Sequence, residues 1–538
     1  MANSKKKEPR MITGVLLLTL AGMAEKILGV IFKIPLAGYL GSVGMGYFNS
    51  AYSIFTTFYT VAVTGLPVAT TIMVSRSRAK GRVLEVKRIF RVSVTMFLTI
   101  GVLGSAIMYF GAEFIANLID KNNNSPYCIQ AIAPILLLIC VSSSIRGFFQ
   151  GHKNMMPSAV SEFLDALGKC ALGILLAWYA YTKGYSTEVS AAAAILGVVM
   201  GHLFGMGFLI ITKCVSKPDY SSLGVELDEM NSDSAGSICK KMLTIAFPVT
   251  LGSLALGLTS TIDTFTIMRA LGTEEGMGLY GDYTTLAAPL YRLPHALIVP
   301  ISTSLTPMLA SAISSGNREN AKSTLFSAFK MAAILSIPCS IGMGVLARPV
   351  ISLLFSGSYS AQIIRNTAPF LSILSVGTFL MAMLTVSSSV LQSYGKQNLP
   401  VISMTCGTVV KLILNIVLVS GIGFIGAPIA TTASYFVMVA LNFIFAIKHT
   451  DLSARIFKAF LPPLIAMLCC VPATVGSFLL FARILPSERL ATVLSVLITA
   501  VLYTAALFLT RAFSKEDIMM LPKGKKIYNF LVRKKLMK

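Results

Sequence analysis

Residues 490–510 read LATVLSVLITAVLYTAALFLT, an apolar stretch without a single charged side chain. About 20 such residues in a helix cross the hydrocarbon core of a bilayer. Comparable stretches recur from Met11 almost to Arg511, separated by short polar breaks, and none shows the alternating pattern of a membrane strand. The sequence therefore predicts an all-α polytopic membrane protein.

The composition supports this fold class. Of the 538 residues, 55% are hydrophobic and 12% are charged, whereas about a quarter of a soluble domain is charged. The nine cysteines are dispersed and show no metal-ligand spacing, so we expect neither a metal site nor a disulfide framework.

The polar breaks divide the chain into about fourteen predicted transmembrane helices, each of roughly 20 residues or more. Their approximate ranges are 12–40, 46–73, 92–118, 128–149, 158–182, 189–212, 243–270, 278–310, 327–355, 364–392, 401–420, 427–447, 459–482 and 490–510.

Basic residues gather in alternate breaks. They precede the first span, fill the break between Arg76 and Arg91, and recur in the tail after Arg511. Because lysine and arginine are retained on the cytoplasmic side, both termini are predicted to be cytoplasmic, which requires an even number of spans. Topology therefore explains the net charge of +23 better than nucleic-acid binding, for which we find no motif.

Two pairs of segments echo each other at similar separations, and each member of the second pair is followed by a lysine in the next span, Lys169 or Lys411. The pairs are LGSVGMGYF (40–48) with LGTEEGMGLY (271–280), and FQGHKNMMP (149–157) with QSYGKQNLP (392–400). Spans 1–6 are therefore predicted to duplicate spans 7–12 as a parallel repeat, an architecture typical of two-lobed transporters.

This repeat predicts the domain organisation. The parts are an N-terminal lobe (1–213), a polar cytoplasmic linker (214–242), a C-terminal lobe (243–447), two additional C-terminal spans (448–511) and a basic cytoplasmic tail (512–538).

The first span carries Glu25, Lys26 and Lys33. Ionisable groups inside a bilayer usually face a partner or a wet cavity. Seven residues separate the lysines, which places them within about 20° of each other on a helix. They form one cationic stripe that Glu25 neutralises only in part. We expect this stripe to line a cavity that receives an anion; the alternative is that Lys26 reaches the interface or pairs with Glu25.

The eighth span carries Arg292 and His295, three residues apart and therefore on one helical face. Pro294 and Pro300 are expected to interrupt this helix, as is tolerated where a helix lines a cavity. Arg292 is a donor suited to phosphate oxygens, and its alternative role is that of an interfacial anchor.

Further ionisable residues are candidates for the cavity wall, for ion coupling or for structural pairing. Asp165 and Lys169 are spaced for a pair within one helix, and Asp263 could bind a coupling cation or an arginine. The candidates are Glu162, Asp165, Lys169, Asp263 and Lys411.

No catalytic fingerprint accompanies these charges. The chain has no Walker A, nucleophile-elbow, HExxH or dinucleotide-binding motif. We therefore expect a protein that is not an enzyme and has no cofactor, driven by an ion gradient, the membrane potential or the lipid gradient itself.

Four stretches carry a family resemblance: residues 24–48 (AEKILGVIFKIPLAGYLGSVGMGYF), 65–69 (GLPVA), 146–169 (RGFFQGHKNMMPSAVSEFLDALGK) and 346–357 (LARPVISLLFSG). Together they resemble the stage V sporulation protein B branch of the polysaccharide-transport proteins. This branch is similar to the MurJ-type lipid II flippases of the multidrug/oligosaccharidyl-lipid/polysaccharide exporter superfamily.

The resemblance implies a two-lobed, V-shaped transporter of the bacterial cytoplasmic membrane. The implied cargo is an undecaprenyl-pyrophosphate-linked peptidoglycan precursor or a related lipid-linked oligosaccharide, used for cell wall or spore cortex. Lys26, Lys33 and Arg292 match the cationic positions of that family, whereas its arginine pair in the second span falls here in the uncharged stretch 56–64.

The expected partners are the lipid-linked glycan, membrane lipids and a coupling cation or the membrane potential. Two other readings remain open. A drug exporter of the same superfamily would have acidic cavity walls to receive organic cations. A scaffold for wall synthesis, which transports nothing, would not need Lys26, Lys33 or Arg292.

Overall fold

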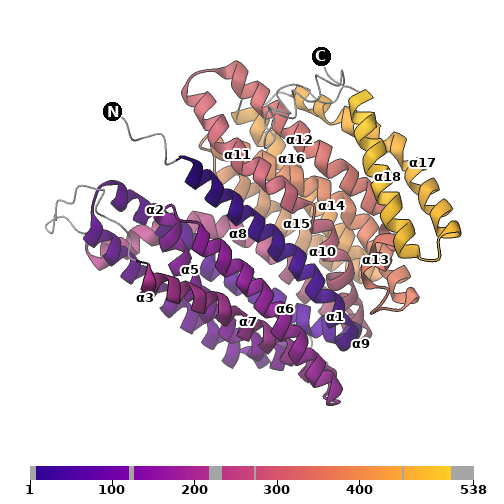
Figure 1. Cartoon of the computed structure of the whole chain (residues 1–538), viewed down its shortest axis with the longest axis horizontal. Coiled ribbons are helices and arrows are strands. Elements are labelled where there is room, and N and C mark those ends of the chain that lie inside the picture. The colour runs from indigo at the N-terminus through magenta and orange to yellow at the C-terminus, as the bar shows by residue number, and fades with distance from the viewer. Residues whose placement is uncertain (1–7, 120–125, 217–232, 272–273, 451–453, 510–538) are drawn as a thin grey trace. The chain divides into compact units, whose positions relative to one another are not determined.

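A computed structural model describes residues 8–119, 126–216, 233–271, 274–450 and 454–509 of the chain (Figure 1). The first lysines, most of the predicted 214–242 linker and the 512–538 tail lie outside these residues.

The described residues form helices and contain no strand, as the sequence predicts. The α-helices of the first half are α1 (Glu8–Val63), α2 (Gly65–Ala79), α3 (Val83–Phe110), α4 (Ala112–Ile119), α5 (Pro126–Gly151), α6 (Met156–Thr182), α7 (Thr187–Val215), α8 (Ala235–Leu271) and α9 (Glu274–Asp282). Those of the second half are α10 (Ala288–Arg292), α11 (His295–Ser314), α12 (Arg318–Val345), α13 (Ala347–Phe355), α14 (Ala361–Ser393), α15 (Asn398–Ile422), α16 (Gly426–His449), α17 (Leu461–Ile484) and α18 (Glu488–Leu509). A π-helix, η3 (Tyr283–Ala287), and two 3₁₀ helices, η4 (Gly423–Ile425) and η5 (Ala454–Ala459), complete the described chain.

Within these ranges, nine helical stretches are long and apolar enough to cross a membrane, or ten if one bent pair counts as a span. Two of these stretches each contain two predicted spans: Ala21–Ala79, with 59 residues, and Asn398–His449, with 52. A helix rises about 1.5 Å per residue, so either stretch is far longer than the roughly 30 Å hydrocarbon core of a bilayer. Two further predicted spans are not among the counted stretches: 158–182, which lies in α6 and carries three ionisable residues, and 278–310, which is divided among α9, η3, α10 and α11.

Each of the two long stretches is broken at a glycine. Gly41 has φ 63° and ψ −173° inside α1, and Gly423 has φ 74° and ψ −158° after α15. A side chain would strain the backbone at such positive φ values, so glycine is suited to both positions. The helix break at Gly41 falls between the predicted spans 12–40 and 46–73.

The chain divides into two compact units, residues 1–285 and 286–538. This division differs from the predicted lobes, which meet at the 214–242 linker, because α8 and α9 pack within the first unit. A Cβ on Gly65 of α2 would lie 2.2 Å from the carbonyl oxygen of Ala246 in α8, so these backbones touch. The predicted lobe boundary remains a prediction.

Within the first unit, residues 42–46 of α1 lie against α9 (Glu274–Asp282), which includes residues 274–280 of the second echo segment. A Cβ on Gly46 would meet Met277, and one on Gly281 would lie 2.0 Å from the carbonyl oxygen of Ser42. Gly46 and Gly281 therefore allow α1 and α9 to approach closely.

Helices α6 and α7 form the closest pair of the first unit (Figure 1). Three glycines spaced four apart on α7, namely Gly197, Gly201 and Gly205, face α6. A Cβ on Gly201 would lie 2.2 Å from the backbone nitrogen of Lys169 and 2.3 Å from the carbonyl carbon of Gly168. Small residues permit such contact between helices in lipid, where dispersion replaces the hydrophobic effect.

In the second unit, α14 packs between α12 and α16. The amide nitrogen of Asn442 in α16 donates to the hydroxyl oxygen of Ser388 in α14 at 2.9 Å. The last two helices lie side by side (Figure 1), and the Tyr503 hydroxyl of α18 donates to the carbonyl oxygen of Ile334 in α12 at 3.0 Å.

We predict that Gly201→Ala lowers the free energy of unfolding by about 1–3 kcal/mol, because the added methyl group must force two backbones apart. Gly207→Ala on the same helix is the matched control, since its Cβ would meet nothing within 4 Å. Denaturant unfolding of both variants in detergent micelles measures the difference. Equal stability would contradict the packing described for this pair.

Candidate functional site

Four helices of the first unit, α1, α5, α6 and α7, surround a cavity of about 310 Å³. Aromatic side chains of α1, including Tyr52 and Tyr59, form part of its wall. Its ionisable lining is Glu25 of α1, Arg146 of α5, Glu162, Asp165 and Lys169 of α6, and His202 of α7. Six ionisable groups inside one apolar helical unit make this cavity the candidate functional site.

Arg146 is the central cation of the cavity. Its guanidinium donates to Asp165 at 2.5 Å and to the Ser161 hydroxyl at 2.8 Å, and it lies 3.9 Å from Glu162. The Arg146 side chain is only 16% exposed. Because a charge that is removed from water needs close partners, Arg146 and the α6 carboxylates stabilise one another.

Asp165 also joins α6 to α7. His202 Nδ1 lies 3.3 Å from Asp165 Oδ2, and His202 Nε2 lies 3.4 Å from the Ser142 hydroxyl. The second carboxylate oxygen, Oδ1, packs at the surface of Gly205, where a Cβ would overlap it. The close α6–α7 packing thus brings Asp165 to His202.

Lys169 lies one turn further along α6 and pairs with Glu25 of α1 at 3.5 Å. The sequence places Asp165 and Lys169 four residues apart and places Glu25 beside Lys26. The structure instead pairs Asp165, Lys169 and Glu25 across helices, because both charges of α6 face neighbouring helices that the sequence cannot position.

The cavity is not fully balanced. Three carboxylates face two permanent cations, so one negative charge is in excess when every carboxylate is ionised. Asp165 Oδ1 and Arg146 Nε are both buried without a hydrogen-bond partner in the described part of the chain. A proton or a small cation on the carboxylates would remove the excess charge, since an uncompensated ion is costly in a low dielectric.

The predicted cationic stripe lies on α1, apart from these ion pairs. Lys26 is exposed, whereas Lys33 is half-buried and donates to the Asn49 side-chain oxygen and the Thr284 carbonyl oxygen, both at 3.0 Å. The Lys33 ammonium group is therefore held by hydrogen bonds to Asn49 of α1 and to the backbone of η3, whereas the Lys26 side chain is accessible to solvent.

Arg292 and His295 belong to the second unit. Arg292 ends α10 and is exposed, and its Nε donates to the Tyr291 hydroxyl at 3.0 Å. His295 begins α11, and its Nε2 lies 2.7 Å from the Thr385 hydroxyl. The expectation that both share one helical face is wrong, because the chain breaks at Pro294 between them; Pro300, by contrast, lies within α11 without ending it.

The remaining candidates are buried in separate helices. Asp263 of α8 is 4% exposed, and Lys411 of α15 is completely buried. Neither lines the cavity of the first unit.

Arg146 and His202 are the cavity residues that the sequence analysis did not select. Both carry a signal, because each is an ionisable residue within a predicted span, 128–149 or 189–212. The uncharged stretch 56–64 also contributes to the first unit: the Thr57 hydroxyl lies 2.5 Å from that of Thr261 in α8.

The model of the family described as "Polysaccharide biosynthesis protein" matches residues 11–313, more than half of the chain. The chain belongs to the polysaccharide biosynthesis protein family. A second family model, MatE, matches residues 248–417.

Two relatives of this family member come from Bacillus subtilis (strain 168). One, the lipid II flippase MurJ, is 25% identical over 462 residues, which are 83% of this chain and 84% of that protein. The other, stage V sporulation protein B, is 23% identical over 521 residues, which are 95% of this chain and 97% of that protein.

Solved structures share the fold of this family member. A lipid II flippase MurJ in an inward closed conformation has a TM-score of 0.68 and 17% identity, covering 91% of this chain and 98% of that one. An inward-facing multidrug resistance MATE family transporter has a TM-score of 0.67 and 18% identity, covering 82% and 95%. The protein is therefore a multi-pass membrane protein that shares the fold of these two structures.

We predict that Arg146→Gln destabilises the first unit by about 3–5 kcal/mol, because it leaves two buried carboxylates without their cation. The double variant Arg146→Gln with Asp165→Asn should recover part of that loss, and Arg146→Lys, which keeps the charge, should lose less. Unfolding in detergent with increasing denaturant measures all three. A double variant no more stable than Arg146→Gln would show that the pair is not coupled.

Proposed function

We propose that this protein is a flippase that moves a lipid-linked glycan precursor, with a pyrophosphate between lipid and sugar, across the cytoplasmic membrane. The observation that carries the proposal is the set of ionisable groups that line the cavity of the first unit, together with relatives named as lipid II flippases. Charges are expensive in a membrane, about 2.5–3.5 kcal/mol each, so a cluster of them inside a span is a functional feature by default.

In this proposal the pyrophosphate is received by Lys26, Lys33 and Arg292. Lys26 and Arg292 are exposed and so accessible to a ligand, while Lys33 is held by hydrogen bonds to Asn49 and Thr284. Lysine and arginine side chains make charge-assisted hydrogen bonds to phosphate oxygens, which offset the cost of removing the anion from water. The lipid tail can stay in the bilayer throughout, so only the polar head needs this path.

We assign ion coupling to the cavity of the first unit rather than to the cationic stripe. Its carboxylates exceed its permanent cations by one, and Asp165 Oδ1 is buried without a partner in the described chain. A proton or a small cation bound by Glu162 and Asp165 would neutralise the cavity. Loading and unloading of that charge would then alter the ion pairs of Arg146, which join α5 to α6.

A cation-coupled multidrug exporter is the second candidate. It is favoured by the MatE match over residues 248–417 and by the acidic excess of the cavity, which could hold an organic cation. The two candidates differ in what they require: an exporter of cations does not need Lys26 or Arg292, whereas a carrier of pyrophosphate does. A scaffold for wall synthesis requires neither the cations nor the carboxylates.

Expression of the chain in bacteria depleted of their lipid II flippase tests the proposal. We expect growth to be rescued, with lipid II detected at the outer leaflet, and Lys26→Gln with Arg292→Gln to reduce that signal by at least about tenfold through lost phosphate contacts. Arg318→Gln with Lys322→Gln, at exposed positions of α12, removes equal charge as a control. Full activity of the first double variant, at equal expression, would overturn the assignment of the pyrophosphate site.

Proteoliposomes with an imposed proton or sodium gradient test the coupling site. We expect Glu162→Gln with Asp165→Asn to abolish the stimulation of flipping by the gradient, because the neutral amides cannot take up the coupling charge. Glu113→Gln, at an exposed position of α4, should respond like the parent chain. A double variant that keeps the full response would place coupling elsewhere.

A further inference from the structure

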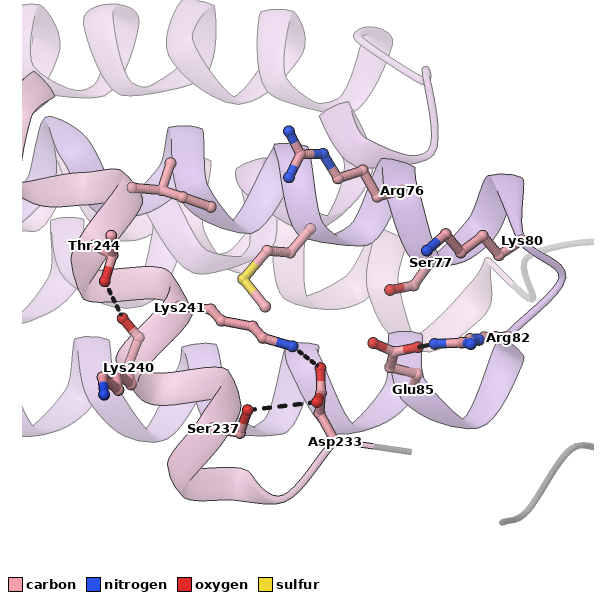
Figure 2. Close-up of a pocket in the computed structure, with 12 residues that line it drawn as sticks. Arg76, Ser77, Lys80, Arg82, Glu85, Asp233, Ser237, Lys240, Lys241 and Thr244 are labelled. Atoms are coloured by element: carbon pink, nitrogen blue, oxygen red, sulfur yellow. Dashed lines mark hydrogen bonds and ion pairs between the residues drawn. The ribbon is translucent and has the colours of Figure 1, made fainter. Parts of the chain in front are cut away.

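A second cavity lies at one end of the first unit, where α2 ends and α3 and α8 begin (Figure 2). Its volume is about 620 Å³, within the range of small-ligand sites. Basic side chains dominate its wall: Arg76 and Lys80 of α2, Arg82 before α3, and Lys240 and Lys241 of α8. None of these residues lines the cavity around Arg146.

Among the residues that the structure describes, two carboxylates line the pocket beside these five cations. Glu85 lies 3.3 Å from Arg82, and Asp233 lies 2.5 Å from Lys241. The hydrogen bond from Lys241 lowers the pKa of the Asp233 carboxyl below its ordinary value. Asp233 is therefore ionised at neutral pH and forms an ion pair with Lys241. Both acids are thus engaged, as Figure 2 shows.

The other three cations, Arg76, Lys80 and Lys240, make no ion pair with any residue that the structure describes (Figure 2). All three are exposed. The described lining of the pocket therefore carries three positive charges in excess. Like charges at close range repel one another, and a bound anion would relieve this repulsion.

The turn between α2 and α3 fixes the position of this basic wall. The Arg82 amide donates to the Ser77 carbonyl oxygen and the Gly81 amide to the Arg78 carbonyl oxygen, both at 3.0 Å, with Gly81 at φ 74°. These are the two hydrogen bonds of a Schellman motif, which ends a helix rigidly. Lys80 and Arg82 lie in the turn itself, so their backbones are held in place before a ligand binds.

The start of α8 is tied to the same wall. Arg88 of α3 donates to the Asp233 carbonyl oxygen at 2.9 Å, and the Ser237 hydroxyl donates to the Asp233 carboxylate at 3.4 Å. The pocket is therefore assembled by contacts among three chain segments, and it does not depend on the flexible ends of lysine side chains alone.

We propose that this pocket binds a phosphate group, with Arg76, Lys80 and Lys240 as its ligands. Arginine offers a planar fork that matches phosphate oxygens, and lysine adds point charges. The pocket lies at the ends of apolar helices, where Met73 and Ile245 complete its wall. The phosphate could therefore belong to an anionic phospholipid headgroup, since basic pockets between transmembrane helices bind such headgroups, or to a soluble phosphate compound.

Two binding measurements on the full chain separate these sources. In the first, native mass spectrometry counts phosphatidylglycerol molecules retained by protein released from mixed phosphatidylcholine and phosphatidylglycerol nanodiscs. In the second, calorimetry measures sodium pyrophosphate binding to protein in pure phosphatidylcholine nanodiscs. Retention without pyrophosphate binding identifies a lipid headgroup site, whereas pyrophosphate binding that is lost when the pocket cations are replaced identifies a pocket open to soluble phosphates.

The decisive variant combines Arg76→Gln, Lys80→Gln and Lys240→Gln. We expect it to weaken binding at least about tenfold in whichever measurement is positive, and binding by the parent chain to weaken as salt rises, since exposed charges are screened. The matched control, Arg318→Gln with Lys322→Gln and Lys396→Gln, removes three exposed cations of the second unit. Lys80→Arg with Lys240→Arg keeps the charge and should keep the binding.

Equal binding by the decisive variant and the control would overturn the proposal, as would the absence of binding in both measurements. The result is independent of the proposed transport function, because none of these residues belongs to the Arg146 cavity or the cationic stripe. A chain that binds phosphate here but fails to flip lipid II would keep this site and lose that function.

Discussion

The ion pair between Arg146 and Asp165 is the interaction on which the first unit depends. A bilayer offers no water to solvate a charge, so each ionisable group inside it must find its partner within the protein. Arg146 meets this requirement with carboxylates from α6, and Lys169 of α6 meets it with Glu25 of α1. Helix α6 thus carries charges that link it to two neighbours and cannot be shifted without separating them.

Glycine packing makes these pairs possible. Gly201 of α7 touches the backbone of α6 at Lys169, and Gly205 lies beneath Asp165. The close approach places His202, on the same helix, within 3.3 Å of the Asp165 carboxylate. Small residues and charged residues therefore act together. The glycines let the helices approach closely, and the charged side chains need this close approach to reach their partners.

The two cavities of the first unit have opposite electrostatic character. The interior one carries an excess of carboxylate and contains groups that a proton or small cation can neutralise. The one at the helix ends carries an excess of lysine and arginine and can neutralise a phosphate. This difference follows from position, because charges in the interior must be nearly balanced, whereas charges at the ends of the helices can keep contact with water.

The amino-acid sequence alone was enough to predict the all-helical membrane fold, because an apolar stretch of about 20 residues in a helix matches the thickness of the hydrocarbon core of a bilayer. It also located the glycine breaks, and it selected Glu162, Asp165 and Lys169 as charges that need partners. It could not name those partners, because Arg146 and His202 lie 19 and 37 residues away from Asp165 along the chain and meet it through helix packing. Nor could it find the basic pocket, whose cations come from two segments more than 150 residues apart and meet where three helices begin or end. Composition and periodicity show which helix faces must be buried and which charged side chains need partners. Which residues supply that burial and those partners depends on which helices lie side by side, and the tertiary structure decides this.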